Sequence, residues 1–240
     1  MKTKLLIFSA LLLTVNFFAQ NYKISHKAIT DKNSKLKYEF SISYPLIKDF
    51  KEHITSMSLF NRFITNKAEG IRVTFNVWMK DWDTTTTNHE MGSFYEAGDS
   101  VFYASNGLIS VLFYELWYFS GAAHPNNSNF SINYDLENHK ELGLGDLLSS
   151  GWGGKISEIC IRELDELKKE HGIEPEDWLK DGAGPSAENF KVFNITKKGL
   201  VITFPTYQVG PYVEGPSEVF IAYDEIRSLI MPGSILAFVK

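Results

Sequence analysis

The fold is constrained most strongly by three consecutive segments rich in Val, Ile, Phe, Tyr and Trp, at residues 93–104, 108–119 and 129–136. β-Branched and aromatic residues at this density favour strands. The pair Asn106-Gly107 separates the first two segments, and Asn-Gly supplies the positive φ values that a tight hairpin requires. The second connection, residues 120–128, is longer than a hairpin needs. The three segments therefore predict an antiparallel β-meander.

The segments before the meander combine a strand with a helix. Residues 38–44 alternate in the manner of a strand, and Pro45 is expected to end it. An amphipathic helix is predicted over residues 48–68, with Gly70 as its stop. Residues 71–78 fit either a strand or a continuation of this helix.

The segments after the meander show a similar mixture of helices and strands. Two helices are expected first, at residues 155–169 and 174–180. A hairpin through a Lys-Lys turn follows, with strands at residues 190–196 and 199–204. A strand at residues 218–222 and a short helix at residues 223–230 come after it. Strands grouped together, with helices between the groups, indicate the α+β class.

The domain organisation follows from this grouping. We expect an antiparallel β-meander with packed helices, built as two α+β halves that share a sheet. The boundary falls inside the meander, with an N-terminal half at residues 20–115 and a C-terminal half at residues 116–240. No repeat at a fixed period and no low-complexity linker interrupts either half.

The first residues have the features of a secretory signal peptide at residues 1–19. Lys2 and Lys4 precede an apolar run at residues 5–15, and Ala19 is the small residue near its exit. The run is shorter than the roughly 20 residues that span a bilayer, and no later stretch reaches that length. We therefore expect an exported protein, periplasmic or extracellular, with no membrane span after cleavage.

Composition excludes several classes of protein. The hydrophobic fraction of 44% and charged fraction of 22% are those of a globular chain, not of a disordered one. Cleavage removes two lysines and no acid, so the net charge changes from −5 to −7. An acidic chain without a basic block is not expected to bind nucleic acid. Cys160, the single cysteine, lies on the apolar face of the helix at residues 155–169 and is expected to be a buried, inert thiol.

The sequence offers no established catalytic or metal-binding motif. The six histidines are scattered without a pair at ligand spacing, and no metal site or cofactor is expected. Nucleophile-elbow, phosphate-loop, dinucleotide and calcium-loop patterns are absent from the sequence. Asp81 and Asp83 flank Trp82, which suits carbohydrate chemistry superficially, but paired catalytic carboxylates usually come from distant segments.

Two loops are the candidate binding site. Residues 120–127 carry small residues, Pro125 and a single titratable side chain, His124. Residues 204–216 carry three prolines, two glycines and two tyrosines, which describes a rigid loop that presents aromatic rings. The candidate binding residues, none assigned a catalytic role, are Gly121, Ala123, His124, Pro125, Asn126, Tyr207, Pro211, Tyr212 and Gly215. The alternative interpretation is structural: fixed turns in which the imidazole and the phenol hydroxyls satisfy backbone groups.

The same loops carry a resemblance to a known family. Gly-Ala-Ala-His-Pro-Asn at residues 121–126, Asn-Tyr-Asp-Leu at 133–136 and Leu-Gly-Asp-Leu-Leu at 144–148 resemble the bacterial extracytoplasmic domain of unknown function 3298, and residues 204–216 resemble its second signature. The preceding half is similar to the companion 4163-type domain. Departures from the family are Ala122, where glycine is usual, and His139-Lys140, where a Gly-Lys turn is usual.

The resemblance implies a setting and a fold. Family members include the outer part of the lysozyme-sensing anti-sigma factor RsiV and the N-terminal region of the peptidoglycan deacetylase PdaC. This chain has neither the sensor's sigma-binding and membrane-spanning segment nor the deacetylase's catalytic domain, so lysozyme and peptidoglycan fragments are carried over only as candidate partners.

Three functions are therefore open at the level of sequence. The first is an exported, non-catalytic binding or accessory domain of the cell envelope that recognises a protein such as lysozyme or a cell-wall glycan. The second is a cell-wall polysaccharide hydrolase or deacetylase that uses His124 with Asp135 or another acid. The third is a purely structural envelope protein. The sequence does not determine the ligand or the oligomeric state.

Overall fold

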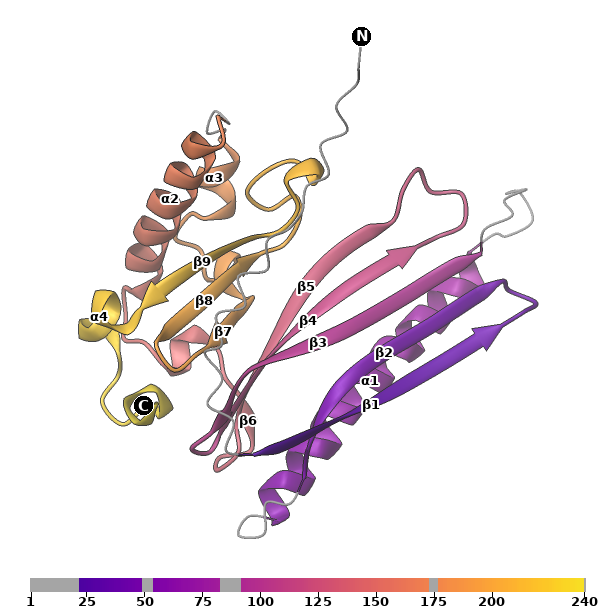
Figure 1. Ribbon diagram of the computed structural model, residues 1–240, viewed down its shortest axis with the longest axis horizontal. Helices are drawn as coiled ribbons and strands as arrows, with labels where there is room; N and C mark the ends of the chain where they lie inside the picture. Colours follow the sequence, from indigo (N-terminus) through magenta and orange to yellow (C-terminus); the bar gives the residue numbers. More distant parts are fainter. Residues whose placement is uncertain (1–21, 49–53, 83–91, 173–176, 240) are drawn as a thin grey trace.

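A computed structural model describes residues 22–48, 54–82, 92–172 and 177–239 (Figure 1). The expected signal peptide, Asp83, the threonine-rich loop at residues 84–87 and the start of the expected helix at residues 174–180 lie outside the described residues. So does the start of the first expected helix, at residues 49–53.

The larger sheet has six strands in the order in which they occur along the chain (Figure 1). Neighbours pair antiparallel except for the second and third strands, which are parallel and joined by a helical crossover. The strands are β1 (Lys23–Asn33), β2 (Tyr38–Lys48), β3 (Ser93–Ser105), β4 (Leu108–Tyr118), β5 (Asn126–Asp135) and β6 (Lys140–Glu141).

The crossover is a single long helix, α1 (Ile54–Asp81), which lies across one face of this sheet (Figure 1). The predicted stop at Gly70 is wrong, and residues 71–78 continue the helix. A glycine inside a helix costs only about 1 kcal/mol relative to alanine. The buried stripe of the helix includes Phe60 and Ile64 before the glycine and Phe75 and Met79 after it, so packing outweighs that cost.

The predicted meander is confirmed as β3, β4 and β5. Asn106 and Gly107 connect the first two strands with φ values of +50° and +76°, the pair of positive angles expected for an Asn-Gly hairpin. β5 begins at Asn126, three residues earlier than predicted, because residues 126–128 already pair with β4.

Pro45 does not end the second strand, which corrects the prediction. β2 runs on to Lys48, and Pro45 is paired with His26 of β1. The parallel pairing with β3 covers only Tyr38–Ile42 of β2. Pro45 therefore lies where the strand has one neighbour, and a residue without an N–H group is tolerated at such an edge.

The smaller sheet belongs to the C-terminal part of the chain. Its three antiparallel strands are β7 (Phe193–Ile195), β8 (Gly199–Phe204) and β9 (Ser217–Ala222), which confirms the predicted Lys-Lys hairpin and the strand after it. The helices α2 (Trp152–Glu170) and α3 (Trp178–Gly182) lie beside this sheet, and α4 (Tyr223–Ile226) follows it (Figure 1).

The two sheets meet through buried polar side chains. Ser110 of β4 accepts hydrogen bonds from the Asn194 side chain at 3.0 Å and from the Ile195 backbone at 2.9 Å. Asn133 of β5 donates to the Phe193 carbonyl at 2.8 Å. These bonds satisfy backbone groups of β7, which has a ladder partner on one side only. The junction is therefore specified by hydrogen bonds as well as by packing.

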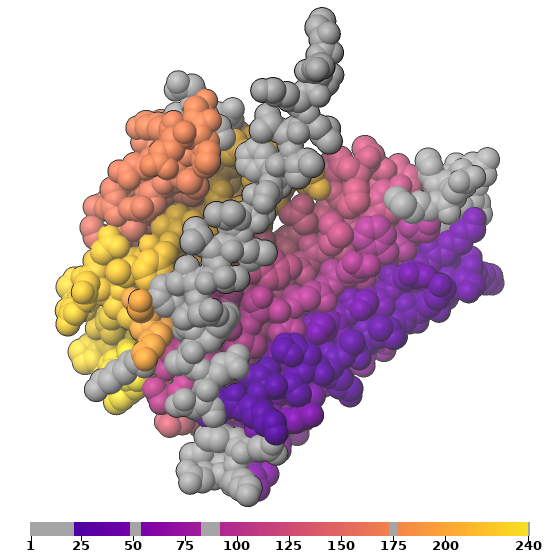
Figure 2. All heavy atoms as spheres, in the orientation of Figure 1, coloured from indigo at the N-terminus to yellow at the C-terminus, as the bar shows by residue number. Residues whose placement is uncertain are grey.

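The protein has two hydrophobic cores, and the larger sheet contributes residues to both. One core lies between α1 and the sheet, while the other joins α2 and the smaller sheet to Tyr103 and Leu108 at the β3–β4 turn. The six-stranded sheet takes strands from both predicted halves, so the α+β prediction with a shared sheet is confirmed. Figure 2 shows the two parts as the flanks of the molecule, indigo to magenta on one side and orange to yellow on the other.

Two further features concern the single cysteine and the length of the helices. Cys160 is fully buried in the second core, and burial raises the pKa of its thiol to about 12, so the thiol stays protonated at neutral pH. Within the described ranges, no helix is long and apolar enough to cross a membrane.

Candidate functional site

The two candidate loops lie together in the folded protein. The rings of His124 and Tyr212 are in contact, with centroids 4.7 Å apart, and the ring of Tyr207 lies 5.5 Å from that of Tyr212. The Tyr212 hydroxyl donates to the Pro125 carbonyl at 2.9 Å, across 87 positions of sequence. We call residues 120–127 and 206–215 the paired-loop surface.

Asn127 ties the two loops at a second point. Its side-chain oxygen accepts from the Thr206 hydroxyl, and its amide nitrogen lies 3.4 Å from the Tyr212 hydroxyl. Asn127 is already part of β5, so the sheet fixes its position. Asn127 and Thr206 are not among the binding residues predicted from the sequence, although each is adjacent to one of them.

An ion pair fastens the second loop to α2. The Lys168 ammonium bonds the Glu214 carboxylate, and the two side chains are 7% and 19% exposed. A Cβ atom at Gly210 would crowd the Glu214 carboxylate and the Lys168 nitrogen, so a larger residue here would displace the ion pair. The Gln208 amide also donates to the carbonyls of Gly182 and Asn189. The loop is therefore pre-organised.

The exposed part of this surface is apolar and partly strained. Tyr207 is 51% exposed and has a φ of +73°, in the left-handed region that a bulky residue rarely adopts. Such strain persists only where surrounding structure enforces it, and it concentrates at functional sites. Val213, at the tip of the loop, is 88% exposed.

The remaining predicted residues serve mainly as turn and backbone positions. Gly121 and Gly215 have φ values of +97° and +70°, which glycine adopts without strain. Ala123 is exposed in the first loop, Asn126 starts β5, and Pro211 precedes a 3₁₀ turn at Tyr212–Glu214.

His124 is oriented by its own neighbour. Its Nδ1 atom lies 2.8 Å from the Pro125 carbonyl oxygen, and because a carbonyl only accepts, Nδ1 carries the proton of that bond. In the neutral imidazole, Nε2 is then the acceptor. His124 is exposed, so Nε2 can accept a hydrogen bond from a partner molecule.

The proposed catalytic acid does not lie beside His124. Asp135 is at the far end of β5, and a ten-residue strand separates its ends by about 30 Å. Its carboxylate accepts bonds from the backbone of Glu137 and Asn138 and from the Asn138 side chain. For the described part of the chain, no ion pair joins His124 to a carboxylate, and no cluster of three or more His, Cys, Asp or Glu could hold a metal ion.

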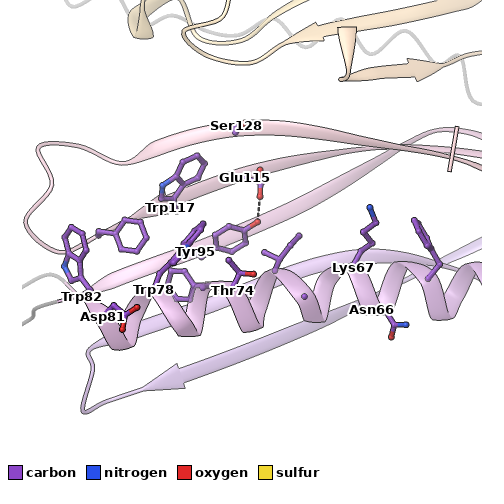
Figure 3. A pocket seen from close by; sticks show the side chains of 15 residues that line it. Asn66, Lys67, Thr74, Trp78, Asp81, Trp82, Tyr95, Glu115, Trp117 and Ser128 are labelled. Carbon is purple, nitrogen blue, oxygen red and sulfur yellow. Dashed lines mark hydrogen bonds between the residues drawn. The ribbon is translucent and has the colours of Figure 1, made fainter. Parts of the chain in front are cut away.

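A second feature was not anticipated from the sequence: a groove of about 1060 Å³ between α1 and the sheet. We call it the α1 groove. Figure 3 shows Trp82 and Asp81 at one end, Asn66 and Lys67 at the other, and Tyr95 and Glu115 between them. Its walls are mainly aromatic and come from α1, β3 and β4; they include Phe63, Phe75, Trp78, Trp82, Tyr95, Trp117 and Phe119.

Glu115 is a carboxylate in an apolar environment. It lies on the face of β4 that otherwise presents Ile109, Val111, Phe113 and Trp117, and it accepts a hydrogen bond from the Tyr95 hydroxyl. Burial raises the pKa of Glu115, and the Tyr95 bond only partly opposes that effect. Burial also raises the pKa of Tyr95, as does the adjacent carboxylate. A signal was present in the sequence, since Glu115 interrupts the alternating apolar stripe of the segment at residues 108–119.

One end of the groove is a rigid aromatic cluster. The Phe119 ring lies 5.0 Å from that of Trp82 and 6.2 Å from those of Trp78 and Phe75. The Trp82 indole N–H donates to the Ser120 carbonyl at 3.2 Å. Asp81, which sequence analysis considered only in a carbohydrate pair with Asp83, instead lines this end of the groove.

These observations define the class of the protein: an α+β domain with two cores on a shared sheet, an aromatic groove and an ordered two-loop surface. Residues 145–224 match the family "Protein of unknown function (DUF3298)". The matched residues run from the 3₁₀ turn before α2 to α4, and they include the second of the two loops.

Two solved structures of DUF3298 family proteins are similar to this chain in fold. A DUF3298 family member from Bacteroides fragilis has a TM-score of 0.65 at 14% identity, over 92% of this chain and 98% of that one. A DUF3298 protein from Pseudomonas aeruginosa has a TM-score of 0.59 at 15% identity, over 89% of this chain and 95% of that one. A search of curated proteins gave no match. The likeness to RsiV and PdaC and the 4163-type first half stay predictions.

Proposed function

We propose that the chain is an exported, non-catalytic binding domain of the bacterial cell envelope that docks a protein partner on the paired-loop surface. The observation that carries the proposal is the pre-organisation of this surface: two loops far apart in sequence are tied by Tyr212, Asn127 and the Lys168–Glu214 ion pair. Ordered tyrosines offer contact area at a low entropic cost on binding.

A protein fits this surface better than a small glycan fragment. Val213 and Tyr207 stand out from the surface, and the three described cavities are all lined by other residues. Small-molecule sites are usually concave, whereas protein interfaces centre on exposed aromatic and apolar anchors. Lysozyme is the first protein to test, and a cell-wall glycan is the alternative ligand.

The hydrolase hypothesis has less support from the geometry. The hypothesis pairs His124 with an acid, and the Asp135 carboxylate lies at the other end of β5 from His124. We therefore keep His124 as a binding residue and assign it no catalytic role.

Calorimetric titration of the purified chain with lysozyme and with soluble peptidoglycan fragments tests the proposal. We expect the protein ligand to bind, and the Tyr207→Ala and Val213→Asp variants to weaken binding by tenfold or more. Phe238→Ala is the matched control, because Phe238 is 61% exposed in the same half but outside the paired-loop surface.

Two results would reject this function. Absence of binding to both ligand classes favours the structural role, and an equal loss of affinity in Phe238→Ala shows that the paired-loop surface is not the site. Binding of peptidoglycan fragments alone, with the same dependence on Tyr207, would replace the protein partner by the glycan.

A further inference from the structure

The α1 groove has an unbalanced charge among aromatic walls. Asp81 and Glu115 line it, and in the described ranges neither carboxylate forms an ion pair with a lysine, arginine or histidine. The one basic residue that lines the groove, Lys67, is paired with Glu141 at 2.9 Å and also lies 5.3 Å from the Phe63 ring centre. The groove therefore presents negative charge that no lining cation neutralises.

The aromatic rings are arranged around this charge. Trp78 and Trp82 come from the helix, and Trp117 and Tyr95 come from the sheet opposite (Figure 3). Trp78 and Trp82 are 51% and 38% exposed, so ring surface is open to a ligand. Aromatic faces attract a cation within about 6 Å of the ring centre, and the attraction grows when the cation loses water.

We propose that the α1 groove binds a small organic cation: an ammonium group carried on an apolar body, with the ammonium at Glu115 and the body against the tryptophans. The volume of about 1060 Å³ is at the upper end of the range for small-ligand pockets. This site is separate from the paired-loop surface and does not rest on the function proposed for it.

The alternative occupant is a glycan, because sugars also stack on tryptophan. A glycan would need several neutral hydrogen-bonding groups around each ring. The groove has three such side chains, Asn66, Thr74 and Ser128, and most of its lining residues are aromatic or aliphatic. Charge complementarity separates the two occupants: an ammonium at Glu115 pairs with that carboxylate, and a neutral sugar leaves it without an ion pair.

Glu115 also predicts how binding depends on pH. Burial raises the pKa of Glu115 and so favours its protonated form, whereas a bound ammonium stabilises the ionised form. Asp81, Lys67 and Tyr95 are the other titratable groups that line the groove, and Tyr95 donates to Glu115. Affinity for a permanent cation should therefore rise as the pH rises through the Glu115 pKa, with release of a proton.

The test uses a pair of ligands that differ in charge: protonated 2-phenylethylamine and neutral 2-phenylethanol, titrated into the purified chain by calorimetry and tryptophan fluorescence at pH 7. We expect the amine to bind at least tenfold more tightly than the alcohol. Glu115→Gln should weaken the amine about tenfold and leave the alcohol unchanged. Glu96→Gln is the matched control, since Glu96 is exposed next to Tyr95 on the same strand.

A second variant tests the location. Gly70 lines the groove, and a Cβ built there meets nothing within 4 Å, so Gly70→Leu fills the groove without a clash at its first atom. Both ligands should lose affinity in this variant.

The proposal is overturned if amine and alcohol bind equally, if neither binds, if Glu96→Gln acts like Glu115→Gln, or if a chitooligosaccharide binds at the groove and the amine does not. Lysozyme titrations test the paired-loop surface alone, so a failure of the groove proposal is distinguishable from a failure of the proposed function.

Discussion

The paired-loop surface and the α1 groove are both rich in aromatic residues, but they differ in how their polar groups are satisfied. In the paired-loop surface, Tyr212, Asn127 and Lys168 bond to groups of the neighbouring loop. In the groove, Asp81 has no ion-pair partner among the described side chains, and Glu115 bonds to a neutral phenol. The polar groups that join the two loops are therefore satisfied within the protein, while the groove carboxylates have no cationic partner in the described part of the chain and can pair with a ligand.

This difference suggests two ways of using aromatic residues. The loops hold tyrosines in fixed positions, and their polar contacts stabilise the loops themselves. The groove keeps tryptophans apart on two facing elements, so ring surface stays open between them. Variants that remove a polar group should therefore affect stability in the loops and ligand affinity in the groove.

The largest expected effect is at the ion pair that fastens the second loop. Lys168→Met leaves the Glu214 carboxylate without its partner, and breaking a buried ion pair by removing one member costs about 3 kcal/mol. Urea unfolding should show this loss of stability. The Lys168→Met/Glu214→Gln double variant should recover most of it, and Lys155→Met, at a more exposed pair of the same helix, should change little.

This prediction fails if the single and double variants are equally unstable. That result would mean that the lysine stem packs the loop and that the charge pairing contributes little.

A smaller effect is expected at the hydroxyl that joins the two loops. Tyr212→Phe removes the donor to the Pro125 carbonyl and the acceptor for Asn127, and a hydrogen bond of this kind contributes about 1 kcal/mol. Tyr207→Phe is the control, because the Tyr207 ring contacts Tyr212 and its hydroxyl forms no hydrogen bond with the described residues. Equal unfolding free energies for the two variants would mean that the hydrogen bonds of the Tyr212 hydroxyl do not stabilise the contact between the loops.

The sequence predicted features that depend on local residue pattern. Asn106-Gly107 fixed the hairpin because the backbone angles it favours are set by the two residues themselves. The predictions at Pro45 and Gly70 were wrong because tertiary structure outweighs the local tendency of these residues to end a strand or a helix. Pro45 lies where its strand has one neighbour, and the buried stripe of α1 continues past Gly70.

The candidate site divides in the same way. His124, Tyr207 and Tyr212 were selected from loop composition, and the structure brings them together. The groove could not be anticipated, because its walls come from α1, β3 and β4 and depend on how the helix lies across the sheet. Asp81 and Trp82 were noted in the sequence only for a carboxylate pair. Glu115 carried a further local signal, a carboxylate in the apolar stripe of a strand with period-two alternation.

The two long helices offer a contrast between glycines. Gly70→Ala should raise the free energy of unfolding by about 0.8 kcal/mol, because alanine is the better helix former and a Cβ there meets open space. Gly153→Ala in α2 should lower it, because the new Cβ would lie 2.9 Å from the Pro185 carbonyl oxygen. Urea or thermal unfolding measures both, and a loss of stability in Gly70→Ala would contradict the open groove.

The smallest expected effect is the pH dependence that Glu115 adds to stability. Its folded-state pKa is raised by burial, so the folded protein holds this proton more tightly than the unfolded chain does. The stabilising contribution is fully present below the unfolded-state pKa and is lost as pH rises through the raised folded-state value. Unfolding free energies measured from pH 4 to pH 7 should therefore fall for the wild type relative to Glu115→Gln, while Glu96→Gln keeps the wild-type slope. A Glu115→Gln difference that is constant with pH would mean that Glu115 is solvated like an ordinary surface carboxylate, and the groove would then lose the charge that distinguishes it from the paired-loop surface.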